Sequence, residues 1–175
     1  IITWYEIWGD YWYHYLGSCG SAGKFMDQVL SHLTPYHIAI SDAVKEDFSH
    51  SFPDRDIQVI PYPVDLPYIS RIPPSEIRSD IIFAGRFIRE KNISLLIEAV
   101  DIIRKTRPEI LCLLVGDGPE IKNLTLKVKN LNLEKNVRFT GFIDEHDEVI
   151  ALMKSSRVFA FPSTREGYGI VALEA

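Results

Sequence analysis

The sequence predicts an α/β protein in which parallel sheets carry helices on both faces. Three observations indicate this fold class: short apolar strands alternate with helical segments of ten or more residues, the predicted strands end at glycine or proline, and a proline-rich stretch separates two such regions. The residues that end the strands are Gly85, Gly116, Gly141 and Pro162. Ligands of parallel α/β sheets bind beyond the carboxyl ends of the strands, so we expect a binding site at these positions.

The region that precedes the prolines is expected to contain two helices and two short strands. Apolar residues at helical spacing predict a helix over 23–33, and Ser41 is a good N-cap for a second helix that continues to about residue 49. The strands are expected over 36–40 and 57–60.

Residues 61–74 contain five of the ten prolines in the chain. Proline cannot continue a helix or donate to a strand ladder, so this stretch is expected to be a stiff connection between domains. We therefore place a domain boundary within this stretch.

The pattern after the linker is regular. The strands are expected over 80–84, 110–115, 137–140 and 157–161. The helices are expected over 92–107, 119–131 and 145–155, and from 168 onward. Pro108 ends the first of these helices, and Pro119 suits the first turn of the second.

Composition excludes several classes of protein. The net charge is −5, from 19 basic and 24 acidic residues, so the chain lacks the broad positive field expected of a nucleic-acid-binding protein. No apolar run reaches the roughly 18–20 residues that span a bilayer. The two cysteines, Cys19 and Cys112, have no zinc-site spacing and suit a reducing compartment. Dinucleotide and P-loop glycine motifs are absent, which argues against a nicotinamide-dependent dehydrogenase.

Two strand ends carry charged or glycine-rich loops. The first contains Arg86 and Lys91, five residues apart before a predicted helix, which suits the binding of a phosphate or simply a solvated loop. The second contains Gly116 and Gly118, and a tight turn with positive φ is the favoured interpretation there.

The last segment, 162–175, carries Glu166 and Glu174 on either side of Gly167 and Gly169. Backbone N–H groups at the start of this helix can form an anion nest, and a carboxylate in front of it can accept hydrogen bonds from sugar hydroxyls. The alternative for Glu174 is a helix residue that simply faces solvent.

Four segments at successive strand ends carry a family resemblance: GRFIREKN, VGDGPE, VRFTGF and FPSTREGYGIVALEA. Together they resemble the retaining glycosyltransferases of family 4, which have the GT-B fold with two Rossmann-like domains. HIAISDAVKEDF and QVIPYPVDL also match, so the resemblance covers nearly the whole chain. It implies that the chain is the middle of a longer two-domain enzyme. In that enzyme, 1–65 would be the C-terminal part of the acceptor-side domain, 66–79 the proline-rich linker, and 80–175 the first part of the nucleotide-sugar-binding domain.

The resemblance assigns roles to residues of this chain. Arg86 and Lys91 match the pair that holds the donor diphosphate, Glu166 matches the glutamate that contacts the transferring sugar, and Glu174 matches the usual ribose contact. Arg86, Lys91 and Glu166 are the expected catalytic residues. The rest of the expected donor site is Gly85, the base-contacting loop residues Arg138, Phe139, Gly141 and Phe142, and the segment Gly167, Tyr168, Gly169 and Ile170.

Two positions differ from the family pattern. Asn92 stands where family members often carry glycine, and Tyr5 stands where a histidine often lies near the donor sugar, so Tyr5 is not counted as catalytic. Tyr5 belongs to the aromatic run 4–15, which contains all three tryptophans. That run is interpreted either as an acceptor surface or as packing around the domain cleft.

The resemblance implies an enzyme that transfers a sugar from a UDP-, GDP- or ADP-sugar to a glycan or lipid-linked acceptor, with retention and without a metal or any other cofactor. The alternatives are a fragment that binds the nucleotide sugar without turnover and another GT-B enzyme, such as a phosphorylase or an epimerase. The implied location is the cytoplasm, with peripheral attachment to the inner face of the membrane, and no nucleic-acid partner is expected.

Overall fold

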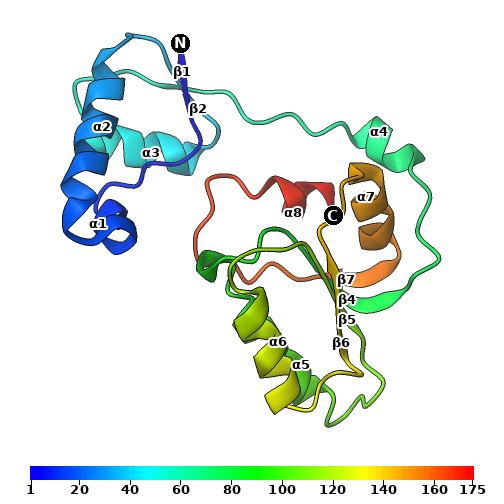
Figure 1. Ribbon diagram of the computed structural model, residues 1–175. Coiled ribbons are helices and arrows are strands. Elements are labelled where there is room, and N and C mark those ends of the chain that lie inside the picture. Colours follow the sequence, from blue (N-terminus) through cyan, green and yellow to red (C-terminus); the bar gives the residue numbers. More distant parts are fainter. The chain divides into compact units, whose positions relative to one another are not determined.

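The computed structural model describes residues 1–175, which form two compact units (Figure 1). The first unit contains Ile1–Pro63 and Glu166–Gly169, and the second contains Val64–Arg165 and Ile170–Ala175. Both units are α/β with parallel strands, as predicted. The chain passes between the units within the proline-rich stretch, but the whole of the predicted linker, 66–79, belongs to the second unit.

The first unit is built on a small parallel sheet. Its strands, in spatial order, are β1 (Ile2–Trp4), β2 (His37–Ala39) and β3 (Gln58–Val59). Its helices are α1 (Tyr11–Leu16), α2 (Gly20–His32) and α3 (Asp42–Ser51), with the 3-10 turn η1 (Gly17–Cys19) between the first two. Ser41 caps α3 as predicted, because its Oγ accepts the Val44 N–H at 3.2 Å.

Two features of the first unit differ from what local patterns indicate. The apolar side of α2 is not a buried face: Phe25 is 69% exposed and Leu33 67% exposed. The aromatic run is only partly packed: Trp4 lies in the core and the Trp8 ring is 4.6 Å from that of Trp12, whereas Tyr13 and Tyr15 are exposed. Tyr5 is exposed.

His37 is a buried histidine in the core of the first unit. Its Nδ1 accepts the Trp4 indole N–H at 3.1 Å, while its Nε2 has no hydrogen-bond partner. Burial lowers the pKa of His37 below the ordinary 6.5, because the charged ring loses its hydration. Folding therefore favours the neutral ring.

Acidification is expected to destabilise the first unit through His37. The unfolded ring takes up a proton below about pH 6.5, whereas the folded ring resists it, so the free energy of unfolding falls with pH from 6.5 down to the lowered pKa of His37. Urea unfolding followed by tryptophan fluorescence measures this slope. His37→Gln keeps an acceptor for Trp4 and should flatten the slope, whereas His50→Ala, at an exposed histidine of α3, should not. Equal slopes for the native protein and His37→Gln would contradict the assignment.

The second unit contains a four-stranded parallel sheet in the order β6-β5-β4-β7. The strands are β4 (Ser79–Ala84), β5 (Cys112–Val115), β6 (Val137–Gly141) and β7 (Ser156–Phe159). The helices are α4 (Leu66–Arg71), α5 (Ile93–Ile103), α6 (Ile121–Asn130), α7 (His146–Lys154) and α8 (Ile170–Glu174), with the 3-10 turn η2 (Arg89–Lys91) before α5.

Helices cover both faces of this sheet (Figure 1). Alternate residues of β4 face opposite ways: Ile81 and Phe83 pack with α5 and α6, while Ile82 and Ala84 pack with α7. Right-handed crossovers explain the division, because the chain moves from β4 through β5 to β6 in one direction and then reverses to β7. The strand order thus changes direction at β4.

Several element ends differ from the predictions. Helix α4 forms inside the stretch predicted to be linker, because Asp65 caps it and Pro67 fits its first turn. Helix α5 stops at Ile103 rather than 107. Pro119 lies in the turn before α6, not in its first turn, because the Ile121 N–H donates to the Gly118 carbonyl.

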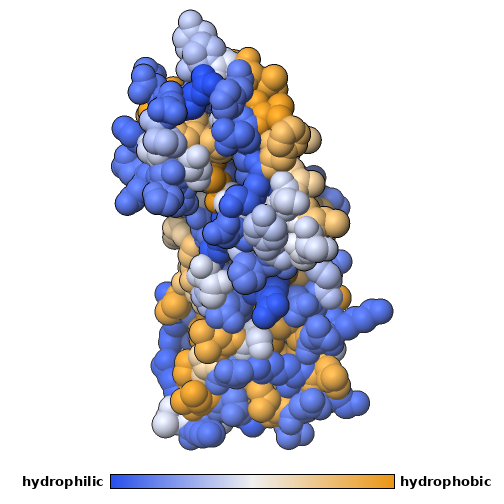
Figure 2. Space-filling model, turned by 90° about the vertical axis from the view of Figure 1, so that its left-hand side faces the viewer, coloured by the Kyte–Doolittle hydropathy of each residue, from blue (hydrophilic) through white to orange (hydrophobic).

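Three further observations concern a buried thiol, the hydropathy of the surface and the length of the helices. Cys112 is buried in the sheet, and burial raises the pKa of its thiol to about 12. Hydrophilic residues predominate on the face shown in Figure 2, with smaller hydrophobic groups among them. None of the helices combines the length and the apolar character needed to cross a bilayer.

Candidate functional site

The carboxyl ends of β4, β5 and β6 are joined at one edge of the second sheet. The Gly85 N–H donates to the Val115 carbonyl at 3.0 Å, and the Gly116 N–H donates to the Gly141 carbonyl at 2.9 Å. The strand order reverses at one of these three strands, β4, whose other neighbour is β7. Such a point leaves room for a ligand, because the connections on its two sides diverge.

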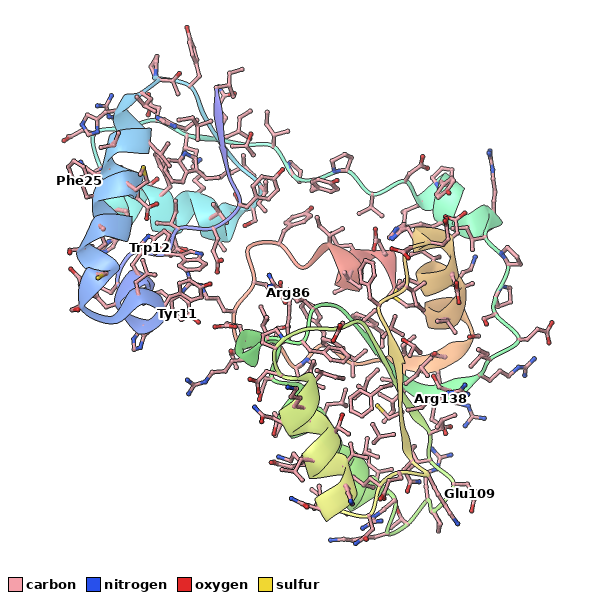
Figure 3. All side chains as sticks on the ribbon, viewed as in Figure 1. Tyr11, Trp12, Phe25, Arg86, Glu109 and Arg138 are labelled. Atoms are coloured by element: carbon pink, nitrogen blue, oxygen red, sulfur yellow. The ribbon has the colours of Figure 1, made fainter.

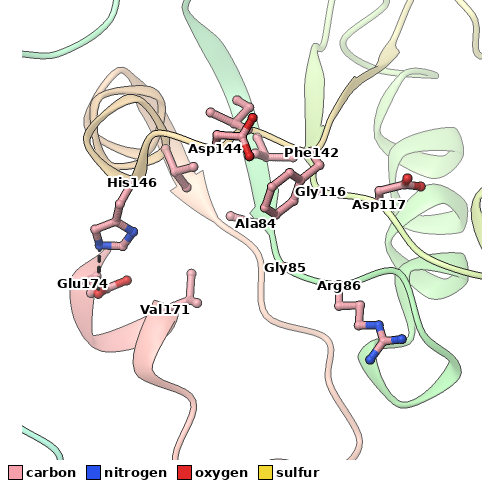
Figure 4. Close-up of a pocket in the computed structure, with 13 residues that line it drawn as sticks. Ala84, Gly85, Arg86, Gly116, Asp117, Phe142, Asp144, His146, Val171 and Glu174 are labelled. Carbon is pink, nitrogen blue, oxygen red and sulfur yellow. Dashed lines mark ion pairs between the residues drawn. The ribbon is translucent and has the colours of Figure 1, made fainter.

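A cavity of about 540 Å³ opens at this edge and lies wholly within the second unit (Figure 4). This volume falls in the range of small-molecule sites. Its polar side chains are Arg86, Asp117, Asp144, His146 and Glu174. Its apolar side chains include Phe142, Val149 and Val171. The cavity therefore combines an apolar wall with charges of both signs.

Arg86 lines the cavity in the loop that follows β4. The neighbouring Phe87 is fully buried; its N–H donates to the Asp117 carbonyl at 2.8 Å and its carbonyl accepts the Glu120 N–H at 3.0 Å. This anchoring fixes the backbone beside Arg86 while the guanidinium stays exposed. Figure 4 shows Arg86 and Glu174 on opposite sides of the cavity.

Lys91 ends the turn η2, five residues after Arg86. Its Nζ lies 5.8 Å from the centre of the Phe161 ring, within the range of a cation–π contact. The Thr164 N–H and Oγ1 both donate to the Glu90 carbonyl, at 2.8 and 3.2 Å. The segment after β7 thus holds the turn that carries Lys91.

The backbone conformation at position 92 explains why Asn92 can stand where family members often carry glycine. It adopts φ +50°, in the left-handed region, between η2 and the start of α5. Glycine reaches this region most readily, and asparagine tolerates it better than most other residues. The Asn at this position therefore preserves the backbone turn that a Gly would make.

Glu174 reaches the cavity from α8. Its Oε1 lies 3.2 Å from His146 Nε2, the first residue of α7, and its side chain is only 14% exposed. The alternative of a solvent-facing helix residue is therefore wrong. Val171, one turn earlier on the same helix, also lines the cavity.

Only part of the loop that was predicted to contact the base lies at the cavity. Phe142 lines the cavity, directly after Gly141. Arg138 and Phe139 lie inside β6, paired in register with Leu113 and Leu114. Neither lines the cavity: Phe139 packs against the core, and Arg138 is exposed, well away from Arg86 in Figure 3.

The segment Glu166–Gly169 belongs to the first unit. There the Gly167 carbonyl accepts the Ser41 hydroxyl at 3.1 Å, and Tyr168 packs against the core of that unit. Gly169 has φ +71°, and helix α8 begins after it, at Ile170, rather than at 168. The predicted donor residues are therefore divided between the two units.

Sequence reasoning missed His146, Asp144 and Asp117. Asp117 and Asp144 each lie one to three residues beyond a glycine that ends a strand, and that position was the available signal. His146 offered none, because it becomes part of the site only through its contact with Glu174. No group of three or more His, Cys, Asp or Glu side chains is arranged to hold a metal ion.

Two curated proteins with similar sequences are both named as enzymes that transfer sugars. YqgM, a glycosyltransferase of Bacillus subtilis (strain 168), is 30% identical over 122 residues, which cover 69% of this chain and 34% of the relative. The 2-deoxystreptamine N-acetyl-D-glucosaminyltransferase of Niallia circulans is 27% identical over 139 residues, covering 78% of this chain and 32% of that protein. The chain thus spans about a third of the length of these curated relatives.

The fold is shared with the solved structure of Anabaena Alr3699/HepE in complex with UDP and glucose. The two have a TM-score of 0.70 and 24% sequence identity, over 85% of this chain and 43% of the other. Together with its parallel sheets, this likeness gives the chain a fold of the GT-B type, of which it covers part.

A family-level match covers most of the chain. Residues 70–175, which include β4 through α8 and the whole cavity, match the family described as Glycosyl transferases group 1. This chain therefore belongs to the group 1 glycosyl transferases.

Proposed function

We propose that this protein is a glycosyltransferase that moves a sugar from a nucleotide-sugar donor to a glycan or lipid-linked acceptor, and that the cavity of the second unit binds the donor nucleotide. The observation that carries the proposal is the placement of Arg86 and Glu174 on opposite sides of one cavity of about 540 Å³. A nucleoside diphosphate needs a cation for its phosphates and a hydrogen-bond acceptor for its ribose. The cavity offers both groups.

Arg86 and Lys91 are proposed to stabilise the leaving diphosphate. The bond between the sugar C1 and the phosphate oxygen breaks, and negative charge grows on the diphosphate. Cations that meet this charge more strongly in the transition state than in the bound donor lower the barrier. Thr164 holds the turn that carries Lys91 through the Glu90 carbonyl, and Lys91 Nζ lies over the Phe161 ring, so little reorganisation is needed when the charge develops.

We propose that transfer retains the anomeric configuration, as in family 4. The acceptor oxygen then attacks C1 on the face from which the diphosphate departs, and its proton passes to a phosphate oxygen of the leaving group. This step balances without a protein nucleophile. Glu166 is proposed to bind hydroxyls of the transferring sugar. A lipid-linked acceptor would bring the enzyme to a membrane surface as a peripheral protein.

UDP is the donor nucleotide that we favour. The Alr3699/HepE structure contains UDP with glucose, and the pneumococcal O-GlcNAc transferase GtfA, 22% identical with a TM-score of 0.66, contains UDP with GlcNAc. GDP- and ADP-sugars are the alternative donors, and their nucleotides are tested beside UDP. Phe142 and the backbone after Gly141 are the proposed contacts of the base.

Calorimetric titration with UDP, GDP and ADP tests the site. We expect saturable binding of at least one nucleoside diphosphate and much weaker binding of the matching nucleoside, which lacks phosphates. Transfer is then measured with the corresponding labelled nucleotide sugars and a set of glycan and lipid-linked acceptors. Binding without transfer to any acceptor would support the alternative of a nucleotide-sugar-binding chain. If none of the three diphosphates bound, the proposed site would be wrong.

A further inference from the structure

The contact between His146 and Glu174 is the one ion pair among the side chains that line the cavity. It joins Nε2 of His146 to Oε1 of Glu174 at 3.2 Å (Figure 4). The two residues come from α7 and α8, which are 28 positions apart in the chain. His146 is more than half exposed, whereas the carboxylate side chain is largely enclosed.

The enclosed carboxylate needs a hydrogen-bond donor. Val149 and Val171 also line the cavity, and the carboxylates of Asp117 and Asp144 lie on the same lining and repel a further negative charge. Only two lining side chains carry N–H donors, Arg86 and His146, and the contact to Glu174 is made by His146.

The contact also determines which oxygen of Glu174 remains available. His146 Nε2 lies 3.2 Å from Oε1, and the second carboxylate oxygen, Oε2, is the one left to accept hydrogen bonds from a ligand. A carboxylate held at one oxygen cannot rotate freely about its last bond. Its second oxygen therefore has a defined direction before the ligand arrives, and less ordering is needed on binding.

We propose that His146 is a positioning residue that orients Glu174 toward the ribose hydroxyls of the donor, and that it thereby makes the cavity select ribonucleotides over nucleotides whose sugar lacks both hydroxyls. This inference rests on the proposed function, because it takes a nucleoside diphosphate as the ligand of the cavity. It adds a determinant of nucleotide selectivity at a position that carries no recognisable sequence motif.

The test compares two ligands against four forms of the protein. The ligands are whichever of UDP, GDP and ADP binds most tightly, and the 2′,3′-dideoxy analogue of that nucleotide. The forms are the native chain, His146→Ala, His146→Gln and Glu148→Ala. Glu148 is an exposed residue of α7 that does not line the cavity, so its variant controls for changes in the helix.

The native chain is expected to prefer the ribonucleotide by about tenfold or more, as for a hydrogen bond to a charged group. In His146→Ala the preference should fall to about threefold or less, with the loss confined to the ribonucleotide. His146→Gln should recover part of the preference, because its amide N–H can donate to Glu174. Glu148→Ala should keep the native preference.

Two outcomes separate this inference from the function on which it rests. If the native chain binds no nucleoside diphosphate, the proposed function fails. If the native chain binds and discriminates, and His146→Ala discriminates equally well, the inference about His146 is wrong while the function stands. A lower melting temperature in His146→Ala with unchanged selectivity would show a structural role only and would also overturn the inference.

Discussion

Replacement of Lys91 by Ala is expected to reduce sugar transfer by about 10²–10³-fold while the protein keeps its fold. The expected loss follows from removing a cation that stabilises the charge on the leaving diphosphate. The fold should survive because Lys91 belongs to neither core cluster of the second unit. It ends the turn η2, and its Nζ lies 5.8 Å from the centre of the Phe161 ring. Initial rates of transfer from the labelled donor measure the effect.

Binding measurements show whether the loss comes from the phosphates. In Lys91→Ala the affinity for the nucleoside diphosphate should fall at least severalfold, whereas any weak binding of the free nucleoside should not change. Lys105→Ala is the matched control, since Lys105 is an exposed lysine just beyond α5 that does not line the cavity. Unchanged transfer by Lys91→Ala, in a variant with a native melting curve, would refute the assignment of Lys91.

Replacement of Gly116 by Ala is expected to destabilise the second unit by about 3 kcal/mol or more. Gly116 has φ +128°, a conformation that residues with a Cβ rarely adopt. An added Cβ would also overlap the Gly85 carbonyl oxygen, which is backbone and cannot move away as a side chain would. The strand ends of β4 and β5 would separate, so binding of the nucleotide should be lost together with stability. Urea unfolding and calorimetry measure the two effects.

Gly141→Ala is the control for the Gly116 prediction. Gly141 also ends a strand at positive φ, +77°, but a Cβ there would meet no atom within 4 Å. The expected cost is therefore only that of the left-handed backbone, about 1–2 kcal/mol. Equal destabilisation by the two variants would mean that the backbone conformation, and not the close approach to Gly85, determines the role of Gly116.

Much of the fold could be predicted because local patterns report local structure. The apolar run that ends at Gly85, and the helical spacing from Ile93 to Val100, both correspond to elements of the second unit. Ser41 marked a helix start for the same reason, since its cap hydrogen bond joins residues only three apart. Errors at element ends arose where turns compete with helices, as at Pro119.

The sequence by itself therefore determined the parallel α/β class, the glycines at the strand ends, and the expectation that Arg86 and Glu174 belong to a binding site. Only the tertiary structure decided that these two side chains share a cavity, that Arg138 stays inside β6, and that His146 contacts Glu174. The physical reason is the range of the interactions. Periodicity and capping act over three or four residues, whereas the strand order and the packing of α7 and α8 bring together groups that are tens of residues apart.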